Sequence, residues 1–456
     1  MILLQLAAAY ITLLGAGLGA TLLIFTRAAR LNVIECGCLA WLFGTGIVSL
    51  LLWVCGMFAS GLALQAVVTI ACVALGLIGW RTKQRAGAKF ALPLPRGAIE
   101  WILASLIVIE IATLFFVSCK HTLGWDGLLV WDIKARYAFI NGGSVPASYY
   151  SNPGRAFSHP EYPLGIPFAE LWLYLWIGEP HQFWGKTIFP VFYAVGAVLL
   201  ALLAARLSRR RWIGLLVAGL LPFIPFLTEG SGGVIVAYAD FPLGVFYLTA
   251  LGYLLYSLGR NEPHSFLIYS SCLALLPWVK SEGVILWFIL VLLGLVASWR
   301  QRKLRAFMLI LGPGLILLGS WRLYLKLMHV VSASDFALPT LQTLQDNAGR
   351  IAPITCVLFS EIMKISHWSI FWLLTGLALA YLLFLFRNMR GLLLASAILL
   401  PIIIYSSTYL FSTWPSYTAH MTSSFPRLLL HVVPAAWLAI GLVLPLPKGD
   451  SLKVRF

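Results

Sequence analysis

Long, uninterrupted runs of apolar residues recur along the whole chain. A helix needs about 18 to 20 such residues to cross a hydrocarbon core of roughly 30 Å. The pattern predicts about thirteen membrane spans, at 2–26, 34–57, 61–80, 98–118, 187–205, 212–228, 241–258, 265–279, 283–299, 306–327, 368–386, 391–412 and 428–446. The expected fold class is therefore an all-α membrane protein, a bundle of transmembrane helices with external loop helices.

One apolar run, 164–177, is shorter than the others. Pro163, Pro167 and Glu170 interrupt it, so we interpret it as an interfacial helix rather than a span. With this run left out, most Lys and Arg residues fall on one side of the membrane, which the positive-inside rule makes cytoplasmic. Those basic clusters are Arg27 and Arg30, 81–96, 206–211, Arg260, 300–305, Arg387 and Arg390, and 448–455.

Composition agrees with this interpretation and excludes some functions. The chain has 61% hydrophobic residues, only 11% charged residues and a mean hydropathy of +0.91, whereas soluble domains have about 25% charged residues. The formal net charge of +16 reflects topology and contact with the lipid bilayer, and we expect no nucleic-acid partner. Most acidic residues map to the external side, partly because acids avoid the anionic cytoplasmic leaflet.

The spacing of the runs suggests three parts. Residues 1–80 form an N-terminal three-helix membrane module, 98–446 form a second transmembrane domain, and 447–456 form a cytoplasmic tail. The second part contains an external loop, 119–186, that is too rich in aromatic residues to be disordered. Long ordered loops are usually functional, so we expect the chemistry there.

Ionisable side chains of several types gather in this loop, which indicates a functional site. A simpler alternative is a purely structural ion pair that holds the loop together. The candidates are the carboxylates Asp126 and Asp132 and the possible substrate-binding residues Lys134, Arg136, His159, Glu161 and Tyr162.

Four further candidates lie at external ends of other spans: Asp240, Lys280, Glu282 and Arg427. Asp240 begins a predicted helix, so its alternative role is a cap on free amides. Lys280 and Glu282 lie in a tight turn and alternatively extend toward water. Arg427 has the charge and geometry to bind a phosphate, which includes an ordinary lipid headgroup.

Several familiar motifs are absent from the sequence. We find no phosphate-binding Gly-rich loop, no paired Cys or His metal motif and no Ser nucleophile elbow. We therefore expect no cofactor, although a divalent cation between Asp126, Asp240 and Glu282 stays open.

In their order along the chain, these segments resemble the integral-membrane glycosyltransferases of the C superfamily (GT-C). The most similar branches are the bacterial protein O-mannosyltransferases and the lipid A aminoarabinose transferases. The resemblance covers roughly 98–446 and rests on "WDIKARYAFINGG", "HPEYPLGIPFAELWLYLWIG", "YADFPLGVFY", "WVKSEG" and "FPRLLLHVVP". The sequence departs from the family in two ways. It has an 80-residue N-terminal extension, and no Glu directly follows the loop aspartate. The second departure leaves open whether Asp126 or Asp132 matches the catalytic aspartate of the family.

The resemblance implies a GT-C-like fold and a sugar donor linked to a polyprenyl phosphate. It also implies transfer with inversion to a hydroxyl of a glycan, lipid or protein acceptor, with a carboxylate as the general base. We choose Asp126 for this role, with Asp132 as the alternative. The expected location is a bacterial inner membrane, with the active site facing the periplasm. Two alternatives stay open, a ligase or polymerase using a diphosphate-linked glycan and a transporter or flippase of lipid-linked sugar. The sequence favours an enzyme because polar residues gather at one face rather than in broken helices at mid-membrane.

Overall fold

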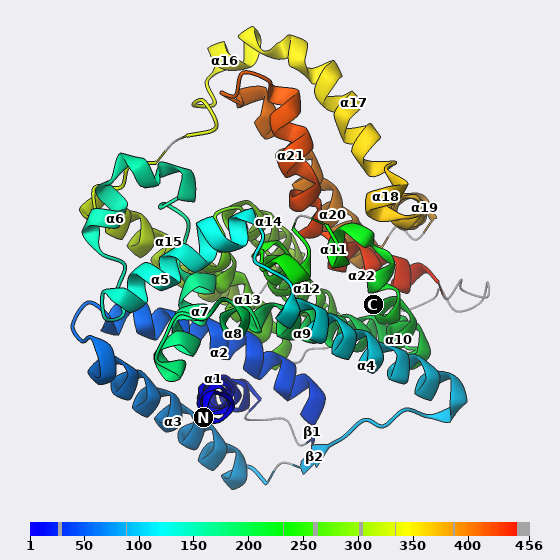
Figure 1. Cartoon of the computed structure of the whole chain (residues 1–456). Coiled ribbons are helices and arrows are strands. Elements are labelled where there is room, and N and C mark those ends of the chain that lie inside the picture. The colour runs from blue at the N-terminus through cyan, green and yellow to red at the C-terminus, as the bar shows by residue number, and fades with distance from the viewer. Residues whose placement is uncertain are drawn as a thin grey trace.

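The computed structural model describes residues 1–25, 30–87, 89–230, 232–258, 263–300, 304–332, 334–385 and 388–444. Helices form almost all of its regular structure (Figure 1). Within the described ranges, 7 helices are long and apolar enough to cross a membrane. An eighth candidate is the pair α21 (Tyr417–Leu430) and α22 (Val433–Val443), which is bent by 52°. The chain is thus an all-α protein of membrane type.

The N-terminal helices α1 (Ile2–Ile24), α2 (Val33–Cys55) and α3 (Gly61–Arg85) pack against one another. Glycines allow this close approach, because a Cβ on Gly17 would lie 1.8 Å from the carbonyl oxygen of Ala40. Helix α2 also packs against α7 and α9, so these helices are continuous with the rest of the bundle. The strands β1 (Arg30–Asn32) and β2 (Lys89–Ala91) pair in parallel beside them.

The loop expected to be ordered is helical. After α4 (Gly97–Lys120) it contains η1 (Gly127–Asp132), α5 (Ile133–Ile140), α6 (Ala147–Ser151), η2 (Pro153–Ser158), α7 (Gly165–Ile177) and α8 (Gln182–Gly185). Helix α7 is the segment interpreted above as interfacial. Protein encloses most of it, since 11 of its 13 residues are buried against neighbours that include α1, α2 and α5. Its orientation to the bilayer stays a prediction.

The middle of the chain comprises α9 (Ile188–Ser208), α10 (Arg211–Gly219), α12 (Asp240–Ser257), α13 (Pro263–Val279), α14 (Gly283–Arg300) and α15 (Leu304–Leu327). Between α10 and α12 lie only short turns, η3 (Leu221–Phe223), α11 (Pro225–Thr228) and η4 (Val234–Val236). The run 212–228 is therefore not one continuous helix, because α10 ends at Gly219 and Pro222 and Pro225 lie in the first turns of η3 and α11, where proline is favoured. This differs from the sequence prediction.

The C-terminal elements are α16 (Leu341–Asp346), η5 (Ala348–Arg350), α17 (Ile351–Ile362), α18 (Ile365–Trp368), α19 (Phe371–Ala380), η6 (Tyr381–Leu385), α20 (Met389–Thr408) and η7 (Tyr409–Phe411), followed by α21 and α22. Of the predicted spans, seven correspond to the long apolar helices and one to the bent pair. Most of the others are shorter apolar helices, such as Gly283–Ser298 and Phe371–Leu385.

The helices α16 and α17 lie at the top of the molecule in Figure 1 and α6 at its upper left, whereas β1 and β2 lie near its lower edge. These are the ends that the charge pattern assigns to the outside and to the cytoplasm. The predicted tail 447–456 and the basic positions Arg27, Arg260, 301–303 and Arg387 lie outside the described residues.

Candidate functional site

Asp126 lies where the chain leaves α4 and enters η1, pressed against the turn 234–238. Glycine makes this contact possible, since a Cβ on Gly127 would lie 2.4 Å from the carbonyl oxygen of Val236. The amide of Gly124 donates to the same carbonyl at 3.0 Å, and the amide of Asp126 donates to the Tyr238 hydroxyl at 3.2 Å. The backbone around the aspartate is thus fixed at both sides.

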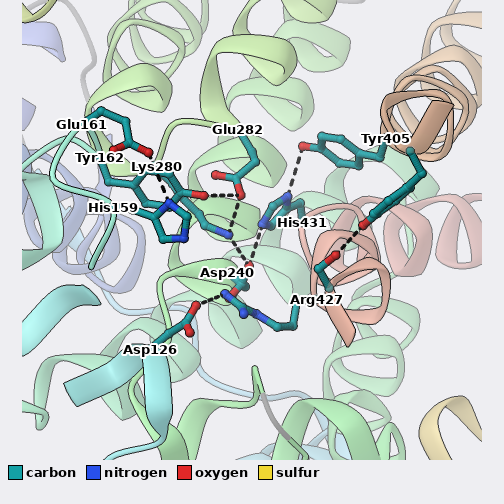
Figure 2. Close-up of polar contacts among 12 residues, drawn as sticks. Asp126, His159, Glu161, Tyr162, Asp240, Lys280, Glu282, Tyr405, Arg427 and His431 are labelled. Carbon is teal, nitrogen blue, oxygen red and sulfur yellow. Dashed lines mark hydrogen bonds and ion pairs between the residues drawn. The ribbon is translucent and has the colours of Figure 1, made fainter. Parts of the chain in front are cut away.

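Asp126 forms an ion pair with Arg427 of α21, a residue 301 positions away in the sequence (Figure 2). The Arg427 guanidinium also lies over the Tyr238 ring, 4.8 Å from its centroid, and its Nε is 3.5 Å from Asp240 Oδ2. Both members of the pair are partly accessible, with side-chain exposures of 19% for Asp126 and 18% for Arg427. A ligand could therefore reach either charge.

Behind this pair lies a buried ionic cluster of Asp240, Lys280 and Glu282. Lys280 Nζ is 2.7 Å from Asp240 Oδ1 and 3.0 Å from Glu282 Oε1. Burial alone would lower the pKa of Lys280, but the two carboxylates raise it above its ordinary value. Burial would likewise raise the pKa of Glu282, but the Lys280 ammonium lowers it. Both groups are therefore charged near neutral pH.

The turn between α13 and α14 that carries these charges is sterically restricted. A Cβ on Gly283 would lie 2.0 Å from the carbonyl oxygen of Leu276. The amide of Gly283 donates to the carbonyl of Lys280 at 2.9 Å. A side chain at position 283 would thus clash with α13, so glycine allows the tight turn that carries Lys280 and Glu282.

Two residues of the cluster, His431 and Tyr405, were missed by the sequence analysis. His431 is fully buried, with Nε2 3.0 Å from Asp240 Oδ1 and Nδ1 3.1 Å from the Tyr405 hydroxyl. It connects Asp240 to α20 (Figure 2). The available signal was its spacing, because His431 lies four residues after Arg427 and follows the last residue of α21, still in helical conformation.

The candidates around 160 lie beside the cluster. The Tyr162 hydroxyl donates to Glu282 Oε1 at 3.3 Å, and His159 Nδ1 is 3.2 Å from Glu161 Oε1. The buried Lys134 ammonium donates to the His159 carbonyl oxygen at 2.7 Å. Burial lowers the pKa of Lys134 to about 7, despite the nearby charges of Glu161 and Asp126.

Asp132 and Arg136, also candidates from the sequence, form a second cluster instead. Asp132 is fully buried, pairs with Arg136 at 2.5 Å and accepts a hydrogen bond from Tyr174 of α7. Glu170 lies close by, and burial, followed by the charge of Asp132, raises its pKa well above the ordinary value. We interpret this cluster as a connection between α5 and α7, which leaves Asp126 as the better placed of the two aspartates.

These contacts assign different chemistry to the carboxylates. Asp240 is fixed by a buried lysine and histidine, whereas Asp126 is partly accessible beside a single arginine. Asp126 is thus the group best placed to accept a proton from a ligand, and Arg427 the cation best placed to hold an anion. Among the described residues, no group of three or more His, Cys, Asp or Glu side chains is arranged to hold a metal ion.

No family model, no curated protein and no solved structure matches this chain.

Proposed function

We propose that this protein is a membrane glycosyltransferase that moves a sugar from a polyprenyl-phosphate-linked donor to an acceptor hydroxyl. The observation that carries the proposal is the contact between Asp126 and Arg427. A glycosyl transfer from a lipid phosphate needs a base for the acceptor proton and a cation for the departing phosphate. Here these two groups lie side by side at one end of apolar helices.

In the proposed reaction, the acceptor hydroxyl oxygen attacks the anomeric carbon of the donor sugar. The bond from that carbon to the phosphate oxygen breaks, and its electron pair leaves with the lipid phosphate. The acceptor proton moves to the Asp126 carboxylate. Because attack comes from the side opposite the phosphate, the configuration at the anomeric carbon inverts.

The ion pair suggests an order of events. In the structure Arg427 donates a hydrogen bond to Asp126 Oδ2, so this oxygen is not free to receive the acceptor proton. A donor phosphate that binds Arg427 competes with Asp126 for the same guanidinium, which makes the carboxylate available to the acceptor. Binding of the donor thus prepares the base.

The buried charges around Asp240 have a positioning role in this scheme. Lys280 and His431 hold Asp240, and Asp240 in turn lies 3.5 Å from Arg427 Nε. We propose that this arrangement orients the Arg427 guanidinium. The site would face the periplasm of a bacterial inner membrane, with a glycan, lipid or protein as the acceptor.

Glycolipid profiling by mass spectrometry of membranes with and without the gene tests this proposal. We expect one envelope glycan, glycolipid or glycoprotein to lose a sugar when the gene is deleted. We also expect detergent extracts containing the protein to restore that transfer. Detergent removes the separation between the two sides of the membrane, so transfer in extracts requires a transferase rather than a flippase. Identical profiles with and without the gene would contradict the proposal.

A further inference from the structure

Two glutamates at the site each leave one oxygen without a hydrogen bond. These oxygens, Glu161 Oε2 and Glu282 Oε2, are buried, although the second oxygen of each carboxylate is engaged. Asp240 Oδ2 also lacks a hydrogen bond, but it lies 3.5 Å from Arg427 Nε, so its charge is paired. A buried acceptor without a donor costs free energy, so such atoms in a native protein need an explanation.

These two glutamates flank one aromatic side chain. Tyr162 follows Glu161 directly and donates to Glu282 through its hydroxyl. Its ring stacks on His159, with centroids 4.8 Å apart. Figure 2 shows Glu161, Tyr162 and Glu282 together on the Lys280 side of Asp240. The Tyr162 ring and the two acceptor groups thus lie close together.

The unpartnered groups match hydroxyl chemistry. Ionised carboxylate oxygens only accept hydrogen bonds, so the two unpartnered oxygens each need a donor. A hydroxyl group can supply it, because it donates one hydrogen bond and accepts others. A molecule with several hydroxyls therefore fits this part of the site better than an anion, which the carboxylates would repel.

From these contacts we infer that Glu161 and Glu282, on either side of Tyr162, form a subsite that binds hydroxyl groups of the donor sugar. This inference rests on the proposed function, which places a lipid phosphate at Arg427. The subsite lies beside that position, because Glu282 contacts Lys280 and Lys280 contacts Asp240, which lies 3.5 Å from Arg427. Arg427 thus holds the phosphate, and the two glutamates select the sugar.

The test measures binding of undecaprenyl phosphate and of the same lipid carrying single hexoses or pentoses, using the purified full-length protein in detergent. We expect at least one sugar-bearing lipid to bind about tenfold more tightly than undecaprenyl phosphate, the gain expected from hydrogen bonds to charged groups. Glu161→Gln should reduce this preference while leaving the affinity for undecaprenyl phosphate unchanged, and Glu282→Gln should also reduce the preference. Glu179→Gln is the matched control, because Glu179 is an exposed glutamate after α7.

The other possible outcomes distinguish a failure of the sugar subsite from a failure of the proposed function. If no sugar-bearing lipid binds better than undecaprenyl phosphate, or if both site variants keep the full preference, the sugar subsite is wrong although phosphate binding stands. If the unsubstituted protein does not bind undecaprenyl phosphate, the proposed function itself is contradicted. Glu161→Gln keeps the test informative if Glu282→Gln misfolds, because Glu161 contacts His159 rather than the buried Lys280.

Discussion

At the scale of single residues, the site contains two kinds of charged side chain: those that a ligand can reach and those that are enclosed by protein. Asp126 and Arg427 retain partial exposure, whereas Asp240 and Lys280 are enclosed. Buried ion pairs add little net stability because of their desolvation cost, but losing one partner leaves an uncompensated charge. Substitutions of the enclosed pair should therefore affect folding, and substitutions of the accessible pair should affect chemistry.

Arg427→Ala should raise the donor KM and lower kcat together. A cation that holds the donor phosphate acts in both the ground state and the transition state, so its loss weakens binding as well as turnover. We expect kcat/KM to fall by about 10²-fold or more, as for other removed electrostatic groups. Steady-state kinetics with varied donor concentration measures this, with the exposed Arg322→Ala as control. An unchanged donor KM would exclude Arg427 from phosphate binding.

Lys134 should make stability depend on pH. Its pKa is lowered by burial to about 7, whereas an unfolded lysine titrates near ~10.4. Between these values the unfolded state binds more protons than the folded state, so stability should rise with pH from about 7 to about 10. Thermal unfolding across this range should show a smaller rise for Lys134→Met. Equal slopes for both proteins would show that Lys134 titrates normally.

Some of the site could be predicted from the sequence and some could not. Asp126, Asp240, Lys280, Glu282 and Arg427 were candidates because each is an ionisable residue at the external end of an apolar run. The choice between Asp126 and Asp132 needed the fold, since only packing against α7 shows that Asp132 is enclosed with Tyr174. Tyr405 was missed because nothing in its own segment distinguishes it from a core aromatic residue.

At the scale of helices, hydropathy located apolar segments but not their breaks. The run 428–446 was expected as one span, yet the structure bends α21 against α22 by 52° and extends α21 back to Tyr417. The residues of α21 before 428 are rich in Ser and Thr, so a hydropathy window gives them little weight. That extension is what places Arg427 within a helix beside the site.

Helix packing at the N-terminus gives a prediction with an internal control. Gly17→Ala should destabilise the contact of α1 with α2, because the added Cβ would lie 1.8 Å from the Ala40 carbonyl oxygen. Gly15→Ala should be tolerated, since nothing lies within 4 Å of its Cβ position. We expect a cost of about 1–3 kcal/mol for overpacking at Gly17, visible as a lower melting temperature in detergent. Similar melting temperatures for the two variants would contradict the packing described here.

At the scale of the whole molecule, the proposed mechanism needs the site to face away from the cytoplasm. Cysteines at Ser151 in α6 and Thr343 in α16 should react with an impermeant thiol reagent from outside, and a cysteine at Arg210 should not. Residues 151 and 210 are exposed in the structure and residue 343 is half-buried. The background should carry Cys356→Ser, because Cys356 is an exposed free cysteine. Labelling from the opposite side would reverse the topology and reject a periplasmic site.

The most direct measurement is the transfer activity of Asp126→Asn beside that of Asp132→Asn, in folded protein purified to equal amounts. The account predicts that Asp126→Asn lowers transfer by about 10²- to 10⁴-fold, as expected for loss of a general base, while donor binding persists. Asp132→Asn should mainly lower thermal stability, because it weakens the buried contact with Arg136. If Asp132→Asn abolishes transfer and Asp126→Asn does not, the base has been assigned to the wrong carboxylate. If neither lowers transfer tenfold, the proposed mechanism is contradicted.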